Sequence, residues 1–202
     1  MNRIIGCGRS GTLYISDALQ KVGIDIKHEI CGKDGTASCY AMTPPPYFGT
    51  INDFVIHKDE DCSKIEWKTT LHQVRNPLLQ IESAYAVFMK EHWKWFERNY
   101  KISTKIPKLL RCMHYYIKIN EHCEKISDYT YRIEDIDNQW SIILKKMGYE
   151  YVKLPDISRT TNRKARYTIP FRKEIEVNWD ILNDTDKVLA SRIKKMAEKY
   201  GY

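Results

Sequence analysis

The sequence predicts an α/β protein in which helices cover both faces of a central parallel sheet, a three-layer α/β/α arrangement. Short apolar runs that suit buried strands alternate along the chain with longer segments of helical periodicity. The chain also opens with a strand, a glycine-rich turn, a helix and a second strand, which is the order of a βαβ unit. Because the 202 residues contain no linker-like tract and no internal repeat, we expect one domain that spans residues 1–202.

The first part of the chain supplies three of the expected strands. Residues 3–5 form a short apolar run that ends at Gly6, and residues 24–28 alternate in the manner of a strand. Between these strands, residues 11–22 have helical spacing that ends at Gly23. Residues 69–74 form the third expected strand, and the proline at position 77 suits the first turn of the next helix. The intervening proline-rich segment, 31–48, is expected to be a loop.

The second part of the chain is mainly helical in pattern. Helices are expected around residues 109–117, 140–147 and 188–197, and a strand is expected at residues 129–133. Gly148 ends the second of these helices. The aromatic residues Trp93, Phe96 and Tyr100 also fall at helical spacing, which favours packing against the sheet over stacking on a carbohydrate.

The composition excludes several classes of protein. With 43% hydrophobic and 29% charged residues, the chain has the make-up of a folded domain and not of a disordered one. No run approaches the roughly 20 apolar residues that a membrane-spanning helix needs, and no early segment has the apolar core of a signal peptide. We therefore expect a cytoplasmic protein with no membrane span, in which the six cysteines are reduced.

The net charge of +7 is unevenly distributed, and most of the positive excess lies after residue 150. Arg163, Lys164 and Arg166 stand in a stretch, residues 159–173, that contains no acidic residue. Such a block favours an anionic partner, although a solvated basic face has the same composition.

A glycine-rich turn between the first strand and the first helix is the first candidate site. Such a turn presents unpaired backbone N–H groups to an anion, aided by the positive end of the helix dipole. The spacing from Gly6 to Gly11 is that of a phosphate loop, but Thr12 replaces the usual lysine and Arg9 supplies the cation. We predict a phosphate site that differs from the ordinary nucleotide-binding loop, with a plain structural turn as the alternative.

A second motif lies at the end of the strand expected at residues 69–74. Arg75 ends this strand, and Ser83 follows eight residues later in the next helix. The carboxyl ends of parallel strands lie where α/β proteins bind ligands, and an arginine with a hydroxyl can hold a second phosphate. Ser83 can share such a group only if Arg75 folds back toward it, and a surface salt bridge is the alternative for Arg75.

Together the two motifs resemble those of the PAPS-dependent sulfotransferases, in which PAPS is 3′-phosphoadenosine 5′-phosphosulfate. In that family a loop like residues 8–12 follows the first strand, and a segment like residues 74–77 precedes a serine at the same spacing. Residues 131–136 also resemble the family's Arg-Tyr-Glu-Asp-Leu segment. The resemblance implies the P-loop NTPase-like sulfotransferase fold. Because no Arg-Lys-Gly segment precedes Trp179, bacterial and carbohydrate-type members are the more similar ones.

The resemblance also implies which residues bind PAPS. It assigns the 3′-phosphate to Arg75 and Ser83, with a basic loop that contains Arg163, Lys164 and Arg166 closing on it. Leu13, where the family often has a second threonine, can still donate its backbone N–H. Arg9 would also stabilise charge on the departing phosphate. The 5′-phosphosulfate is assigned to Gly8, Arg9, Ser10, Gly11, Thr12 and Leu13.

Transfer of a sulfuryl group needs a base that takes the proton of the acceptor hydroxyl. Glu29, just after the second strand, resembles in position the base of several sulfotransferases, and His28 is the competing candidate because other branches use a histidine. Strand alternation would direct these two side chains to opposite sides, so that only one serves the site. Asp34 is the next candidate.

The resemblance implies a sulfotransferase that moves the sulfuryl group from PAPS to a hydroxyl of a small-molecule or carbohydrate acceptor, with no metal expected. One alternative is a P-loop kinase of small molecules, which would need Mg²⁺ and the lysine that Thr12 replaces. The other is a non-catalytic module that binds nucleic acid through residues 159–173, although no recognised nucleic-acid motif is present.

Overall fold

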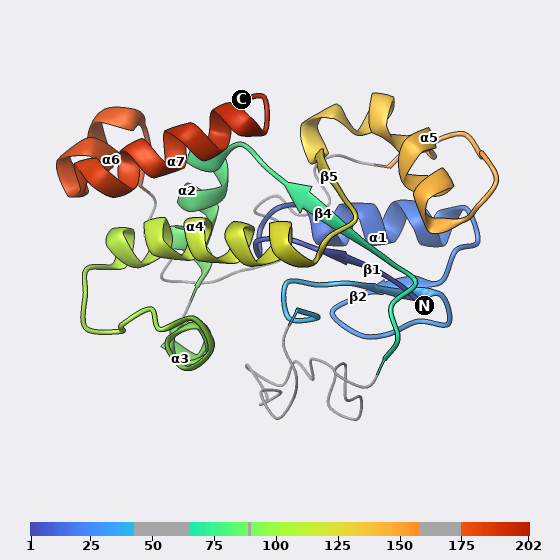
Figure 1. The fold of residues 1–202 in the computed structure, drawn as a ribbon, viewed down its shortest axis with the longest axis horizontal. Coiled ribbons are helices and arrows are strands. Elements are labelled where there is room, and N and C mark those ends of the chain that lie inside the picture. The colour runs from blue at the N-terminus through green and yellow to red at the C-terminus, as the bar shows by residue number, and fades with distance from the viewer. Residues whose placement is uncertain (43–64, 89, 158–174) are drawn as a thin grey trace.

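The centre of the protein is a sheet of five parallel strands in the order β2-β3-β1-β4-β5. The structure, a computed structural model, describes residues 1–42, 65–88, 90–157 and 175–202. The α/β class and the parallel sheet expected from the sequence are confirmed (Figure 1). The strands are β1 (Asn2–Ile5), β2 (Ile26–His28), β3 (Gly35–Ala37), β4 (Thr69–Val74) and β5 (Tyr129–Arg132).

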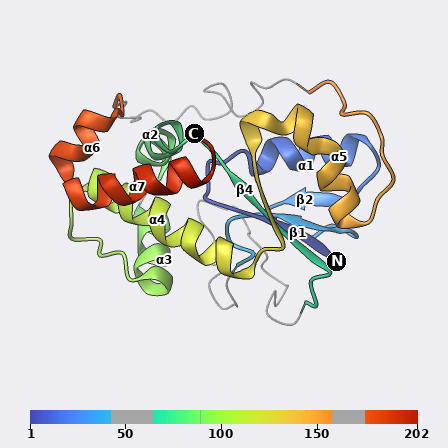
Figure 2. The same cartoon turned by 45° about the horizontal axis from the view of Figure 1, so that its top comes forward.

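Helices lie on both faces of this sheet. One face is covered by α1 and α5, and the other by α4 with the helices that pack around it (Figures 1 and 2). A short 3-10 helix, η2 (Ile133–Asp135), joins β5 to α5. The α-helices are α1 (Thr12–Lys21), α2 (Pro77–Val87), α3 (Lys90–Tyr100), α4 (Lys108–Ile126), α5 (Ile136–Met147), α6 (Trp179–Thr185) and α7 (Lys187–Lys199).

Strand β1 separates two hydrophobic cores. Ile4 packs with residues of α1 and α5, whereas Ile5 packs with the cluster built from α2, α3, α4 and α7. Neither side chain has any solvent exposure. Because successive side chains of a strand point to opposite faces, the pair of isoleucines fixes β1 in the middle of the molecule. The residues that follow Ile5 are therefore delivered to the centre of the sheet's carboxyl edge.

Helix ends follow the sequence signals. Pro77 is the first residue of α2, and the Asn76 side chain caps the helix by accepting hydrogen bonds from the backbone N–H groups of Leu78 and Leu79. Gly148 ends α5 in the left-handed conformation, with φ of 83°. The helix start at Pro77 and the helix end at Gly148, both expected from the sequence, are confirmed.

Strand β3 was not expected from the sequence, which suggested a loop over residues 31–48. Its three residues, Gly35 to Ala37, are too few to show a periodic pattern. Gly35 lies so close to β1 that a Cβ atom there would stand 1.7 Å from the Asn2 carbonyl oxygen, and its φ is 148°. The absence of a side chain at Gly35 therefore permits the close backbone contact of the β1–β3 pairing. The hydrophobic pattern of the sequence does not reveal such a contact.

The aromatic residues of α3 are buried in the core as the helical spacing indicated, and their ring contacts are with the end of α2 and with α4. Trp93 and Phe96 are almost fully buried. Their rings contact Phe88, which follows α2, and Tyr115 of α4. Helix α3 therefore extends the core on the α4 side of the molecule.

His72 of β4 is buried in a polar contact between the sheet and α4. Its Nε2 atom lies 3.0 Å from Asn120 Oδ1 of α4, and its Nδ1 atom lies 3.3 Å from Thr130 Oγ1 of β5. Burial lowers the pKa of this imidazole from 6.5 to about 4. The folded protein therefore contains the neutral form of His72.

This burial predicts a loss of stability in weak acid. Below its unfolded-state pKa of 6.5 the imidazole binds a proton in the unfolded chain, while the folded chain resists protonation until about pH 4. The free energy of unfolding should therefore fall by about 1.4 kcal/mol per pH unit within this window, and His72 should contribute no further loss below it. Urea unfolding at a series of pH values measures this slope. His72→Gln, which cannot titrate, should show a shallower slope, and equal slopes would contradict the assignment.

Candidate active site

The loop between β1 and α1 has the backbone geometry of an anion site. Arg9 and Gly11 both have positive φ, of 76° and 98°, which turns the chain sharply at the carboxyl edge of the sheet. Helix α1 begins without a side-chain cap. An α-helix leaves its first N–H groups without intrahelical acceptors, and in α1 these include the N–H groups of Thr12 and Leu13, next to the loop. Such a concave backbone, combined with the helix dipole, is suited to a phosphate or sulfate group.

Two of the residues assigned to the anion have their backbone groups occupied within the protein. The Gly8 N–H donates to Tyr115 Oη of α4 at 2.5 Å, and the Gly8 carbonyl accepts from Gln80 Nε2 of α2 at 2.9 Å. The Ser10 N–H donates to the Cys7 carbonyl oxygen at 3.0 Å. Gly8 and Ser10 therefore shape the loop, and the start of α1 is left to provide backbone donors.

The structure brings the two sequence motifs together. Arg9 Nε donates to Ser83 Oγ of α2 at 3.1 Å, and Arg75 Nη1 donates to the Arg9 carbonyl oxygen at 2.9 Å. Arg75 thus folds back toward the loop, as the pairing with Ser83 requires. The Arg9 side chain extends toward Ser83, so it joins the pair assigned to the 3′-phosphate. All three side chains are half-buried and retain contact with solvent.

The expectation that His28 and Glu29 point to opposite sides was wrong. Strand β2 ends at His28, and Glu29 has a φ of 63°, so strand alternation stops before Glu29. The His28 Nε2 atom lies 3.8 Å from Glu29 Oε1 and 3.1 Å from Thr12 Oγ1. An imidazole and a carboxylate therefore lie together beside the start of α1. Their side chains are 24% and 30% exposed, which leaves both accessible to a small molecule.

Asp34, the further candidate for the base, lies at the amino-terminal ends of the strands, opposite the loop that follows β1. It immediately precedes β3, and its Oδ2 atom accepts a hydrogen bond from the Asp25 N–H at 2.8 Å. The loop after β1 lies at the carboxyl ends of the strands, so Asp34 is separated from it by the length of the sheet. The suggestion that Asp34 serves as the base was therefore wrong.

Gln73 of β4 contacts the loop and was missed in the sequence. Its Nε2 atom donates to the Ser10 carbonyl oxygen at 2.8 Å, and its Oε1 atom accepts from Tyr131 Oη of β5 at 2.7 Å. Gln73 has no solvent exposure. The amide side chain of Gln73 in a short strand was the one available signal, although the same strand also contains two threonines and a histidine. Gln80 and Tyr115, which hold Gly8, gave no such signal because they belong to helices with ordinary spacing.

The basic segment assigned to the 3′-phosphate, with Arg163, Lys164 and Arg166, lies outside the described residues. Within the described ranges, no group of three or more His, Cys, Asp and Glu side chains is arranged to hold a metal ion. The described cysteines are free, and burial raises the pKa of the Cys7 thiol beside the loop. Cys7 is therefore a packed side chain and not a reactive thiolate.

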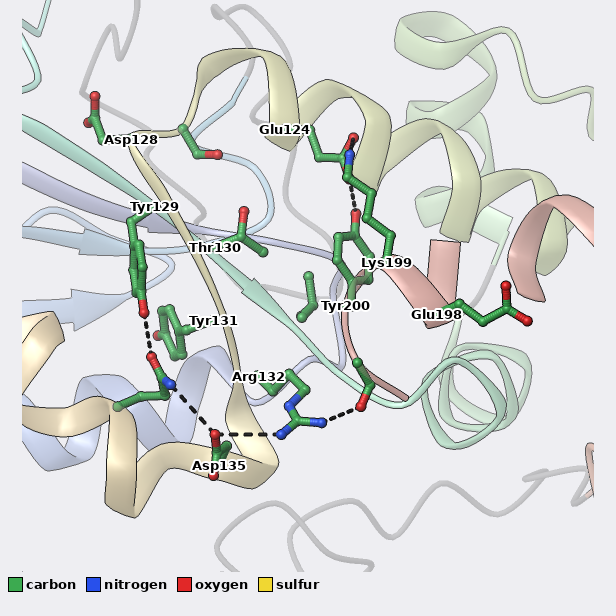
Figure 3. A pocket seen from close by; sticks show the side chains of 14 residues that line it. Glu124, Asp128, Tyr129, Thr130, Tyr131, Arg132, Asp135, Glu198, Lys199 and Tyr200 are labelled. Atoms are coloured by element: carbon green, nitrogen blue, oxygen red, sulfur yellow. Dashed lines mark hydrogen bonds and ion pairs between the residues drawn. The ribbon is translucent and has the colours of Figure 1, made fainter. Parts of the chain in front are cut away.

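Two grooves lie near this region without including its arginines. One, of about 690 Å³, lies between the two helices of one face and is lined by Tyr14 of the first turn of α1 and by Trp140 of α5. The other, of about 850 Å³, follows β5 and the end of α7, with Arg132 and Tyr200 among its lining residues (Figure 3). Neither groove is lined by Arg9 or Arg75.

Comparison of the chain with family models, with curated proteins and with solved structures found no match. The resemblance to sulfotransferases consequently depends on the sequence motifs alone. None of the helices in the described parts of the chain has the length and apolar character needed to cross a membrane.

The contact between Gly8 and Tyr115 predicts a specific effect on stability. Tyr115→Phe leaves the buried Gly8 N–H without its acceptor, which should lower the free energy of unfolding by about 1–3 kcal/mol. The neighbouring Tyr116 is equally buried, and its hydroxyl has no hydrogen-bond partner among the described residues, so Tyr116→Phe should be neutral or stabilising. Denaturant unfolding of both variants measures the difference. Equal losses would show that the Gly8 contact contributes nothing.

Proposed function

We propose that this protein is a PAPS-dependent sulfotransferase. The observation that carries the proposal is the junction of Arg9, Arg75 and Ser83, in which one hydrogen bond joins the glycine-rich loop to the end of β4 and a second joins it to α2. The two motifs are 66 or more residues apart in the chain, and a chance similarity in either one would not require them to meet. PAPS carries two separate anionic groups. The junction offers cations and a hydroxyl that suit one of these groups, and the adjacent start of α1 suits the other.

In this proposal the two anionic ends of PAPS bind at different positions in and beside the junction. The 5′-phosphosulfate lies at the start of α1, where the N–H groups of Thr12 and Leu13 and the helix dipole meet its charge. The 3′-phosphate lies against Arg75 and Ser83, and displaces the present hydrogen bond between Ser83 and Arg9. The Arg9 guanidinium, no longer hydrogen-bonded to Ser83, then faces both anions.

Sulfuryl transfer proceeds by attack of the acceptor oxygen on sulfur, in line with the bond that breaks. The new bond joins sulfur to the acceptor oxygen, and the broken bond releases the 5′-phosphate oxygen of 3′-phosphoadenosine 5′-phosphate (PAP). The acceptor's proton passes to the base. Negative charge grows on the departing phosphate. The helix start is already oriented to stabilise this charge, and Arg9 joins it once the 3′-phosphate has displaced the hydrogen bond between Arg9 and Ser83.

We assign the base to Glu29. The His28 Nε2 atom is shared with Thr12 Oγ1 at 3.1 Å, so the imidazole is already engaged with the residue that opens α1. The Glu29 carboxylate lies 3.8 Å from the same nitrogen. In this arrangement His28 orients Thr12 and Glu29, and the carboxylate accepts the proton of the hydroxyl.

The residues of the site match those of a P-loop kinase less well than those of a sulfotransferase. A P-loop kinase uses a lysine after the second loop glycine, where this chain has Thr12, and a carboxylate on the strand beside the loop. Here the side chain that β4 extends to the loop is the amide of Gln73, with both ends hydrogen-bonded to protein. A module that binds nucleic acid would have no need of the junction.

A thermal-shift comparison tests the proposal against both alternatives. PAP should raise the melting temperature of the protein, since a ligand that binds only the folded state stabilises it. ATP with Mg²⁺ and a DNA duplex should give smaller shifts. A larger shift with ATP and Mg²⁺ favours the kinase, and a larger shift with DNA favours the nucleic-acid module.

Arg75→Ala should weaken PAP binding by about 1.5–3 kcal/mol, the range for hydrogen bonds to charged groups. Adenosine 5′-phosphosulfate (APS), which lacks the 3′-phosphate, should bind the variant and the wild type equally. Isothermal titration calorimetry with both ligands measures the two affinities. Arg192→Ala is the matched control, because Arg192 is an exposed arginine that pairs with Glu121. If both ligands lose affinity to the same extent, Arg75 supports the loop and does not bind the phosphate.

Glu29→Gln should lower kcat by about 10²–10⁴-fold, the usual contribution of a general base, while PAP affinity stays close to that of the wild type. Hydrolysis of PAPS to PAP provides a readout that needs no acceptor. His28→Asn tests the competing base in the same assay and should have the smaller effect. Near-normal turnover of Glu29→Gln together with an inactive His28→Asn would transfer the role of base to His28.

A further inference from the structure

Glu134 of η2 uses both oxygens of its carboxylate to join two distant parts of the chain. Its Oε1 atom accepts a hydrogen bond from the Asn76 N–H at 2.9 Å, and its Oε2 atom accepts from Tyr202 Oη at 2.5 Å. Hydrogen bonds to an ionised carboxylate are shorter and stronger than those between neutral groups. Glu134 therefore connects the start of α2 with the residues that follow α7.

The Asn76 N–H is a sensitive point for the proposed nucleotide site. Asn76 follows Arg75 directly, and its own side chain caps α2. Its backbone therefore sets both the direction in which Arg75 leaves β4 and the start of the helix that carries Ser83. A bond that holds this peptide group restrains the two residues assigned to the 3′-phosphate, without contacting the ligand.

Tyr202 is itself held in place at the end of β5. Its ring lies 5.6 Å from the Arg132 guanidinium, and Arg132 also donates to the Gly201 carbonyl oxygen and lies 3.5 Å from Asp135 (Figure 3). Burial, followed by the hydrogen bond to Glu134, raises the pKa of the Tyr202 phenol well above its usual range. The phenol consequently keeps its proton and acts as the donor to Glu134.

We propose that Glu134 is a positioning residue for the 3′-phosphate of the nucleotide, acting through the Asn76 peptide group and held in its working orientation by Tyr202. This inference rests on the proposed function. Glu134→Gln replaces one carboxylate oxygen by an NH₂ group and removes the charge, so one of the two hydrogen bonds loses its acceptor or reverses its direction, and the other is no longer charge-assisted. Tyr202→Phe removes the hydroxyl that donates to Glu134 and leaves the hydrogen bond from the Asn76 N–H intact.

The test is a double-mutant cycle with PAP as the probe. Glu134→Gln should weaken PAP binding about three- to tenfold, and Tyr202→Phe by a smaller factor, while the affinity for APS is unchanged. In the Arg75→Ala background, Glu134→Gln should cause a clearly smaller additional loss, because only Ser83 remains of the two residues that it restrains. Glu121→Gln, an exposed carboxylate that pairs with Arg192, is the control and should bind PAP as the wild type does.

The outcomes separate this inference from the proposed function. Equal losses for both ligands, or the same loss with and without Arg75, would show that Glu134 acts only on general stability and would overturn the inference. An unchanged PAP affinity in Glu134→Gln would overturn it as well, with the sulfotransferase proposal intact. A wild-type protein that fails to bind PAP would overturn the proposed function and the role of Glu134 together.

Discussion

The backbone of Gly8 is held by two side chains from the helical layer, and the geometry of the candidate site follows from these contacts. Tyr115 of α4 accepts from the Gly8 N–H, and Gln80 of α2 donates to the Gly8 carbonyl. Both groups are buried, where leaving either one unpaired would be costly. The loop is thus fixed to α2 and α4 before any ligand arrives, and Arg9, the next residue, is directed toward Ser83.

The order of the strands divides the site into two sides. The central strand β1 delivers the loop, β4 delivers Arg75 on one side of it, and β2 delivers His28 on the other. In the proposed reaction the nucleotide would occupy the β4 side and the acceptor the β2 side, with the start of α1 between them. The loop reaches both sides, since Thr12 contacts His28 and Arg9 contacts Ser83.

Local signals in the sequence predicted much of this structure, because they depend on near neighbours in the chain. Pro77 and Gly148 mark helix ends through their own backbone preferences, and the glycine loop has a fixed spacing. The nearness of His28 to Glu29 depends instead on a positive φ at a non-glycine residue, which no side-chain pattern reveals. Likewise, Gln80 and Tyr115 act on Gly8 from 72 and 107 residues away, and only the tertiary fold brings them there.

The contact between Gly35 and β1 bears on how variation in this chain would be interpreted. A methyl group at this position would collide with the Asn2 carbonyl and push β3, together with β2, away from the rest of the sheet. Any constraint on position 35 would therefore come from backbone crowding at the amino ends of the strands, far from the candidate chemistry. Invariance of this glycine among related chains would be evidence of a shared sheet and would say nothing about a shared reaction.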